Sequence, residues 1–205
     1  MSRLPSAERA LATLPDCVTA VAFICLWMLP LAFGESGVRN AMLVMLVEFV
    51  LVHATGFLGV AAFAENASRL RKVGMLAGFA VLYLVFIAAF SFAFDAWWPF
   101  LAFGWLLLGK LGVVFGGARD ASGRTARDAP HAWAMSALAY IVAVFATLFL
   151  PLPRLGLGEA VLPQLELPGS GVWVEQPHRV IAAGALYFGL MAWGKWRAGR
   201  HPVHA

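Results

Sequence analysis

The sequence predicts an all-α fold, a polytopic transmembrane bundle of six helices with both termini in the cytoplasm. Three observations lead to this prediction: the composition, the lengths of the apolar segments and the placement of the basic residues. Hydrophobic residues occupy 61% of the 205 positions and charged residues 13%, whereas about a quarter of an ordinary soluble domain is charged. A chain with so few polar groups cannot cover its surface in water. We therefore expect one transmembrane domain over residues 1–205, with the lipid bilayer as its medium.

Six apolar segments are long enough to cross a bilayer, whose hydrocarbon core of about 30 Å takes about 20 helical residues. The expected spans are residues 17–33, 41–64, 75–94, 98–117, 132–150 and 180–196. Pro30 is expected to bend the far end of the first span. Trp97 and Trp98, followed by Pro99, are expected to form a turn at the membrane interface, where indole rings are favoured. These spans use nearly the whole chain and leave no room for a separate soluble domain.

The basic residues are concentrated in every second segment that connects the predicted spans, and in both tails. They gather in the N-terminal tail, the second loop, the fourth loop and the C-terminal tail, as Arg3, Arg9, Arg69, Arg71, Lys72, Arg119, Arg124, Arg127, Lys195, Arg197 and Arg200. The other loops hold only Arg39, Arg154 and Arg179. Because cytoplasmic loops carry the excess of Lys and Arg, six spans with both termini inside satisfy the pattern. A five-span arrangement would place one basic cluster on the wrong face. The net charge of +4 thus records orientation, and nucleic acid is not expected as a partner.

The composition also bears on the compartment. Preference for Arg over Lys, with abundant Ala and Gly, is typical of GC-rich bacteria, so we place the protein in a bacterial cytoplasmic (inner) membrane. The first span can also be interpreted as a secretory signal with Ala32 and Gly34 at a cleavage site, but a chain beginning at Met1 favours its retention. Cys17 and Cys25 are about 12 Å apart along one helix. That distance is too long for a disulfide, so both are expected to act as small hydrophobic residues.

The longest connection, residues 151–179, is rich in Pro and Gly and is expected on the outer surface. Little regular structure is predicted there apart from an interfacial segment near 161–167. The loop is either a lid over a substrate entrance or a plain connector. Glu175, His178 and Arg179 stand where it enters the last span. We assign them to an outer entrance, although capping of the following helix explains most of this polar group.

Three ionisable residues are expected within the hydrocarbon region, Glu48, His53 and Lys110. An ionisable group near the bilayer centre costs roughly 2.5 to 3.5 kcal/mol, so it normally faces a protein interior or a wet cavity. We predict that the second and fourth spans face each other through their glycine-rich edges. The three side chains would then form one polar cluster, with Thr55 near the direction of Glu48. The alternative is a structural network in which Glu48 is protonated, His53 is neutral and Lys110 extends toward the inner interface.

The cluster favours a binding site for a small polar ligand, a proton or an ion. We therefore predict a small-solute transporter or a proton- or ion-coupled permease. The alternative is a non-catalytic subunit or assembly factor of a larger membrane complex, with other membrane subunits or a second copy of the chain as partners. An enzyme is less favoured, because neither a nucleophile nor a metal-ligand set accompanies the acid and the histidine. No catalytic or metal residue is assigned, and the cofactor is left open: haem would need a second ligand besides His53. No family signature is matched closely enough to transfer residue roles.

Overall fold

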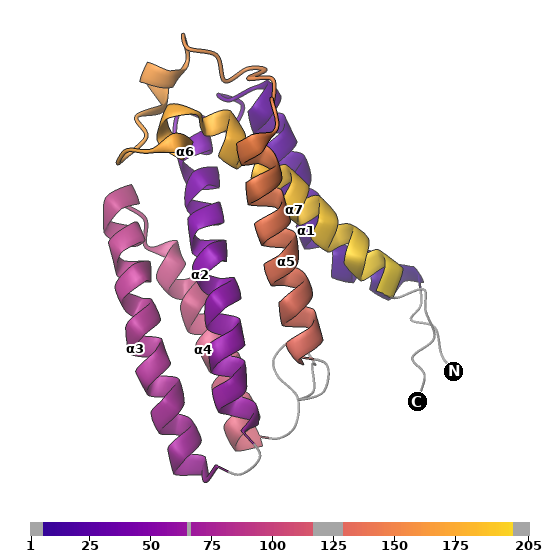
Figure 1. Cartoon of the computed structure of the whole chain (residues 1–205), viewed down its shortest axis with the longest axis vertical. Helices are drawn as coiled ribbons and strands as arrows, with labels where there is room; N and C mark the ends of the chain where they lie inside the picture. Colours follow the sequence, from indigo (N-terminus) through magenta and orange to yellow (C-terminus); the bar gives the residue numbers. More distant parts are fainter. Residues whose placement is uncertain (1–5, 65–66, 117–128, 199–205) are drawn as a thin grey trace. The chain divides into compact units, whose positions relative to one another are not determined.

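The computed structural model describes residues 6–64, 67–116 and 129–198, and these residues are helical with connecting turns and no strand. The α-helices are α1 (Ser6–Met28), α2 (Gly37–Phe63), α3 (Arg69–Phe94), α4 (Trp98–Gly116), α5 (Ala129–Phe149), α6 (Val172–Glu175) and α7 (Pro177–Ala198), and a 3-10 helix η1 (Leu162–Leu165) lies in the long loop (Figure 1). The predicted all-α class is therefore confirmed. Arg3, Arg119, Arg124, Arg127 and Arg200 lie outside the described residues.

Within the part of the chain that the structure describes, four helical segments are long and apolar enough to cross a membrane: Ala10–Met28, Gly37–Phe63, Arg69–Phe94 and Pro130–Phe149. Large apolar side chains on these helices point outward, as with Val60 and Phe149, which are 74% and 75% exposed. In water such exposure would be costly, whereas lipid tails can cover it. The chain is thus a membrane protein. α4 and α7 have 19 and 22 residues and coincide with the other two predicted spans. That both cross the bilayer, and that the termini are cytoplasmic, stay predictions.

The described chain forms two compact units, Met1–Met42 with Ala139–Ala205, and Leu43–Leu138. We call these the terminal unit and the central unit. Their boundaries fall inside α2 and α5, so each of these helices contributes to both.

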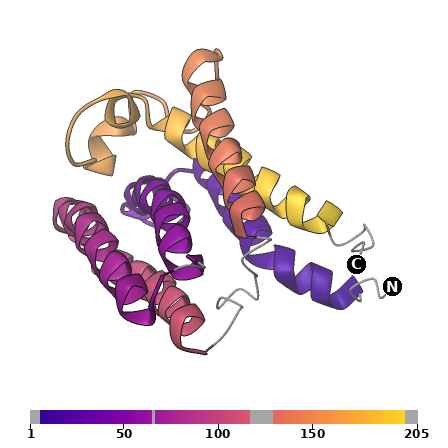
Figure 2. The ribbon, with the colours of Figure 1, turned by 60° about the horizontal axis from the view of Figure 1, so that its bottom comes forward.

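In the terminal unit, α1 and α7 lie side by side and antiparallel (Figures 1 and 2). Phe23 of α1 is 2% exposed, and its ring lies 5.7 Å from that of Phe188. Gly184 faces the same Phe23 ring so closely that a side chain there would overlap it. At the other end of the pair Lys195 meets Asp16. The start of α1 and the end of α7 therefore lie at the same end of this unit.

The long loop of the terminal unit is fastened to the end of α1. The Trp27 indole N–H donates to the carbonyl of Pro153, 3.0 Å away. In return the Gly156 N–H donates to the Trp27 carbonyl, also at 3.0 Å, and so satisfies one of the carbonyls that a helix end leaves open. Leu157 and Leu165 are each 1% exposed. The loop is thus anchored by buried side chains and backbone bonds, and η1 lies inside the predicted 161–167 segment.

The first span was expected to continue past Pro30 with a bend, but α1 ends at Met28 and turns follow. The physical reason is that the proline ring disfavours the helical conformation of the preceding residue. By contrast, Pro15 lies inside α1, because the helix begins about ten residues before the predicted span.

In the central unit, α3 and α4 pack together as a helical hairpin. Ser68 caps α3 by accepting from the Arg71 N–H at 3.3 Å. Asp95 ends α3 in the left-handed region at φ 50°. A turn lies at the predicted place: Trp97 belongs to it and is 69% exposed, while Trp98 already begins α4. That this turn lies at the membrane interface stays a prediction.

Aromatic contacts hold α2 against this hairpin. Phe57 of α2 lies 5.3 Å from Phe79 of α3, between ring centroids, and Tyr83 of α3 lies 6.5 Å from Phe103 of α4. Tyr83 and Phe103 are buried, at 8% and 1% exposure. This aromatic packing positions α2, which carries three of the predicted site residues, Glu48, His53 and Thr55.

Candidate functional site

His53 is held by its own helix. Its Nδ1 lies 2.7 Å from the carbonyl oxygen of Phe49, and the two rings are 4.2 Å apart between centroids. A carbonyl oxygen only accepts hydrogen bonds, so in the neutral ring Nδ1 carries the proton and Nε2 keeps its lone pair. The half-buried imidazole is therefore oriented to accept a proton or to bind a ligand through Nε2.

Glu48 is half-buried on the same helix, five residues before His53. Five residues correspond to a rise of about 7.5 Å and a rotation of about 140° around the axis. The two side chains consequently leave α2 in different directions. Both belong to a helix that is apolar enough to cross a membrane.

Lys110 is the predicted site residue with the deepest burial, at 2% exposure. Its Nζ lies 5.8 Å from the centre of the Phe63 ring, a distance at which an ammonium is attracted to an aromatic face. Phe63 is the last residue of α2. The lysine therefore extends toward the end of α2 that follows His53, and not toward Glu48.

This direction separates the three residues that were expected to form one cluster. Glu48 and Phe63 are 15 positions apart, which is about 22 Å along a helix. Even with all side chains extended toward each other, the Lys110 ammonium and the Glu48 carboxylate stay about 9 Å apart. The expected direct Glu48–Lys110 pair is therefore not formed. That Lys110 extends toward the inner interface stays a prediction.

The Thr55 side chain has its hydrogen-bond partner within its own helix, because its hydroxyl donates to the Leu51 carbonyl at 2.7 Å.

The same turn of α2 makes a contact with α5 that the sequence did not reveal. The Trp133 indole N–H of α5 donates to the Val52 carbonyl at 2.9 Å, and its ring lies over Gly56, where a Cβ would come within 2.7 Å of it. Because Gly56 has no side chain, the Trp133 ring can pack against α2 one turn from His53.

The residues assigned to an outer entrance have different surroundings. The Nη1 group of Arg179 donates to the carbonyls of Thr147 and Leu148, at 2.7 and 2.6 Å, so the guanidinium caps the end of α5. Its Nε donates to Gln176 Oε1 at 2.5 Å. His178 is buried, at 4% exposure, whereas Glu175 is exposed.

Its surroundings favour the neutral form of the His178 imidazole. Desolvation by burial lowers the pKa of His178 from its ordinary 6.5, and the positive charges of Arg179 and Arg154 lower it further. Arg154 itself pairs with Glu159 at 2.7 Å. The hydrogen bonds of Arg179 give it a capping role, and a role of this group as an entrance stays a prediction.

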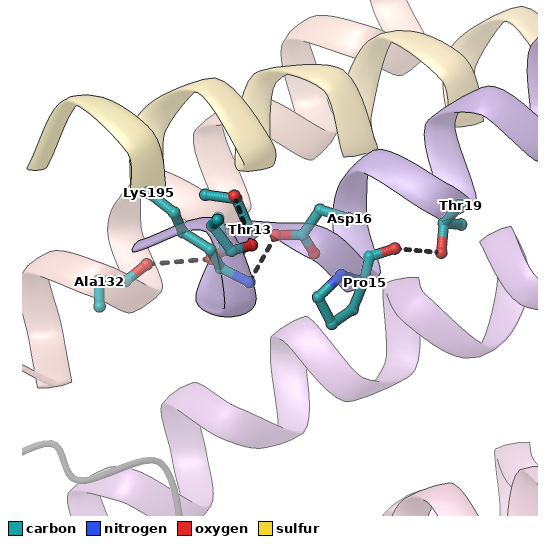
Figure 3. A network of polar contacts seen from close by, with 8 residues as sticks. Thr13, Pro15, Asp16, Thr19, Ala132 and Lys195 are labelled. Atoms are coloured by element: carbon teal, nitrogen blue, oxygen red, sulfur yellow. Dashed lines mark hydrogen bonds and ion pairs between the residues drawn. The ribbon is translucent and has the colours of Figure 1, made fainter. Parts of the chain in front are cut away.

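A polar network between the two ends of the chain was missed by sequence reasoning. Lys195 Nζ lies 2.6 Å from Asp16 Oδ2, and Figure 3 shows the two side chains pointing toward each other across α1 and α7, with Thr13 beside them. The Thr13 hydroxyl donates to the Ala10 carbonyl at 3.1 Å. An acid near one terminus and a base near the other offered a weak signal, because both were predicted on the cytoplasmic side.

Among the residues that the structure describes, no group of three or more His, Cys, Asp or Glu side chains is placed to hold a metal ion. Cys17 and Cys25 are free thiols. Comparison of the chain with protein-family models, with curated protein sequences and with solved structures finds no match.

Proposed function

We propose that this membrane protein moves a small solute or an ion across the bilayer in a proton-coupled manner, with Glu48 and His53 as the proton-carrying groups. The observation that carries the proposal is the hydrogen bond that orients the His53 imidazole. Its Nδ1 is bonded to the Phe49 carbonyl, which leaves Nε2 as the acceptor within a helix that is apolar enough to span a membrane.

Glu48 supports the proposal because it is a second proton carrier on the same helix. Its half-buried carboxyl lies a rise of about 7.5 Å from His53. Transfer between the two therefore runs through an intervening water or ligand. Keeping both groups inside an apolar helix costs several kcal/mol of insertion free energy, and helix packing alone does not offset this cost.

Lys110 contributes a fixed positive charge nearer the end of α2. It is 2% exposed and lies against Phe63. In this proposal it attracts the solute or its counter-charge after passage by His53, and it takes no part in a direct ion pair with Glu48.

Proton flux in liposomes tests the proposal. The purified protein is reconstituted with an internal pH dye, a potassium diffusion potential is set, and a panel of inorganic ions, amino acids and sugars is added outside. We expect wild-type flux with at least one member of the panel. Glu48→Gln and His53→Asn should abolish it. The asparagine amide replaces the Nδ1 donor to Phe49 but has no counterpart of Nε2.

Two exposed residues supply matched controls, since Glu159→Gln and His131→Asn remove the same chemical groups in the long loop and in the first turn of α5. Both controls should keep wild-type flux. The proposal is overturned if no member of the panel gives flux above that of protein-free liposomes. It is also overturned if the Glu48 and His53 variants transport as fast as the controls.

A further inference from the structure

Two arginines of the described chain are each stacked on an aromatic ring. In the last turn of α7, the guanidinium carbon of Arg197 lies 4.5 Å from the centre of the Trp193 ring. Both residues are exposed, Trp193 by 56%. In the central unit, the guanidinium carbon of Arg69 lies 5.8 Å from the centre of the Phe115 ring, which is 59% exposed.

Arg69 and Arg197 differ from Arg154, Arg179 and Lys195 in how their side-chain donors are used. Arg154 pairs with Glu159, Arg179 caps α5, and Lys195 pairs with Asp16. Within the described residues, Arg69 and Arg197 make neither a hydrogen bond nor an ion pair through their side chains. Each guanidinium lies over its ring, and its N–H donors stay available to a ligand.

The chemistry that fits such a group is a phosphate. A guanidinium presents its N–H donors as a rigid fork that matches phosphate oxygens, and stacking on a ring leaves the fork free. An exposed indole ring such as that of Trp193 favours the level of the lipid headgroups. Basic residues next to a membrane helix recognise anionic lipids. Arg71 is exposed near Arg69 and adds positive charge there.

We propose that the Arg197–Trp193 pair and the Arg69–Phe115 pair each bind the headgroup phosphate of an anionic phospholipid. The ring lies against the upper acyl chain and the guanidinium holds the phosphate. The two sites occur in different units of the chain. Neither depends on the proposed transport function, because both lie away from Glu48 and His53 in the sequence and use none of its groups.

Native mass spectrometry of the detergent-solubilised full chain, titrated with phosphatidylglycerol or phosphatidylcholine, tests this assignment. We expect phosphatidylglycerol to bind more tightly. Arg197→Gln and Arg69→Gln should each weaken one bound lipid by roughly fivefold, which is the effect of about 1 kcal/mol per basic residue. Arg154→Gln is the matched control, because its guanidinium already pairs with Glu159, and it should leave lipid binding unchanged.

Three results would overturn the proposal. The first is equal affinity of the wild-type chain for the two lipids, a measurement that needs no variant to fold. The second is a pair of Gln variants, at Arg197 and Arg69, with normal helix content and unchanged phosphatidylglycerol affinity. The third is binding of inorganic phosphate alone as tight as that of the lipid, which would assign the sites to a soluble anion.

Discussion

Gly184 of α7 offers the sharpest test of how the terminal unit is held together. A Cβ at this position would overlap three ring atoms of Phe23, including Cζ at 2.6 Å. Phe23 is 2% exposed and has little room to withdraw. Gly189, in the same helix, has nothing within 4 Å of the corresponding position. Gly184→Ala and Gly189→Ala therefore add the same methyl group to one helix. At position 184 this methyl group overlaps the Phe23 ring, whereas at position 189 it enters open space.

The difference between the two variants isolates the packing cost. Both gain about 1 kcal/mol of helix propensity when Gly becomes Ala. Only Gly184→Ala forces the Phe23 ring to move, and such overpacking costs about 1 to 3 kcal/mol. Displacement of the ring from Phe188 adds about 0.5 to 1.5 kcal/mol if that aromatic contact is lost. We expect Gly184→Ala to be less stable than Gly189→Ala by about 1 to 4 kcal/mol.

Unfolding in mixed micelles of a mild detergent and dodecyl sulfate, followed by circular dichroism, measures this difference. The unfolding midpoint of Gly189→Ala should equal or exceed that of the wild type. The midpoint of Gly184→Ala should fall below both. If Gly184→Ala is as stable as Gly189→Ala, Phe23 does not pack on Gly184 and the described α1–α7 contact is incorrect.

Two further predictions concern other parts of the molecule. Gly56→Ala should displace the Trp133 ring and break its hydrogen bond to α2, which shifts the tryptophan fluorescence and lowers the free energy of unfolding by about 1 to 3 kcal/mol. Gly59→Ala is the control, because nothing lies within 4 Å of a Cβ at that position. Equal fluorescence spectra for the two variants would contradict the contact between Trp133 and Gly56. Because the folded protein holds the pKa of His178 below 6.5, the unfolded chain takes up this proton first, so this contribution to stability is complete above pH 6.5 and is lost as the pH falls below it. His178→Asn should flatten the decline in unfolding midpoint between pH 7.5 and pH 5, and a decline as steep as that of the wild type would refute the role of this imidazole.

The helices themselves could be predicted from the sequence with small errors at their ends. α2, α3, α4 and α5 lie within about six residues of the predicted spans at each end, because continuous apolar stretches and the turn at Asp95 are local signals. The largest difference is in α1, which extends to Ser6 and stops before Pro30. Polar residues such as Ser6 and Arg9 do not signal a helix by hydrophobicity, although they can extend one.

The candidate site was predictable in its residue types and not in its geometry. An acid, a histidine and a lysine in apolar segments stand out by their cost in lipid. The direction in which Lys110 extends depends on Phe63, a residue of another helix. The pairing of Asp16 with Lys195 likewise joins positions near opposite ends of the chain, and no local pattern encodes such a distance.

The sequence by itself determined the medium of this protein, since a chain that is 61% hydrophobic can bury its helices only in lipid. The tertiary structure alone decided which small residues matter. Gly56 and Gly184 each receive an aromatic ring from a neighbouring helix, whereas Gly59 and Gly189 face open space. The four look alike in the sequence, because a glycine has no side chain to reveal its partner, and only the packed helices show where a ring takes that space.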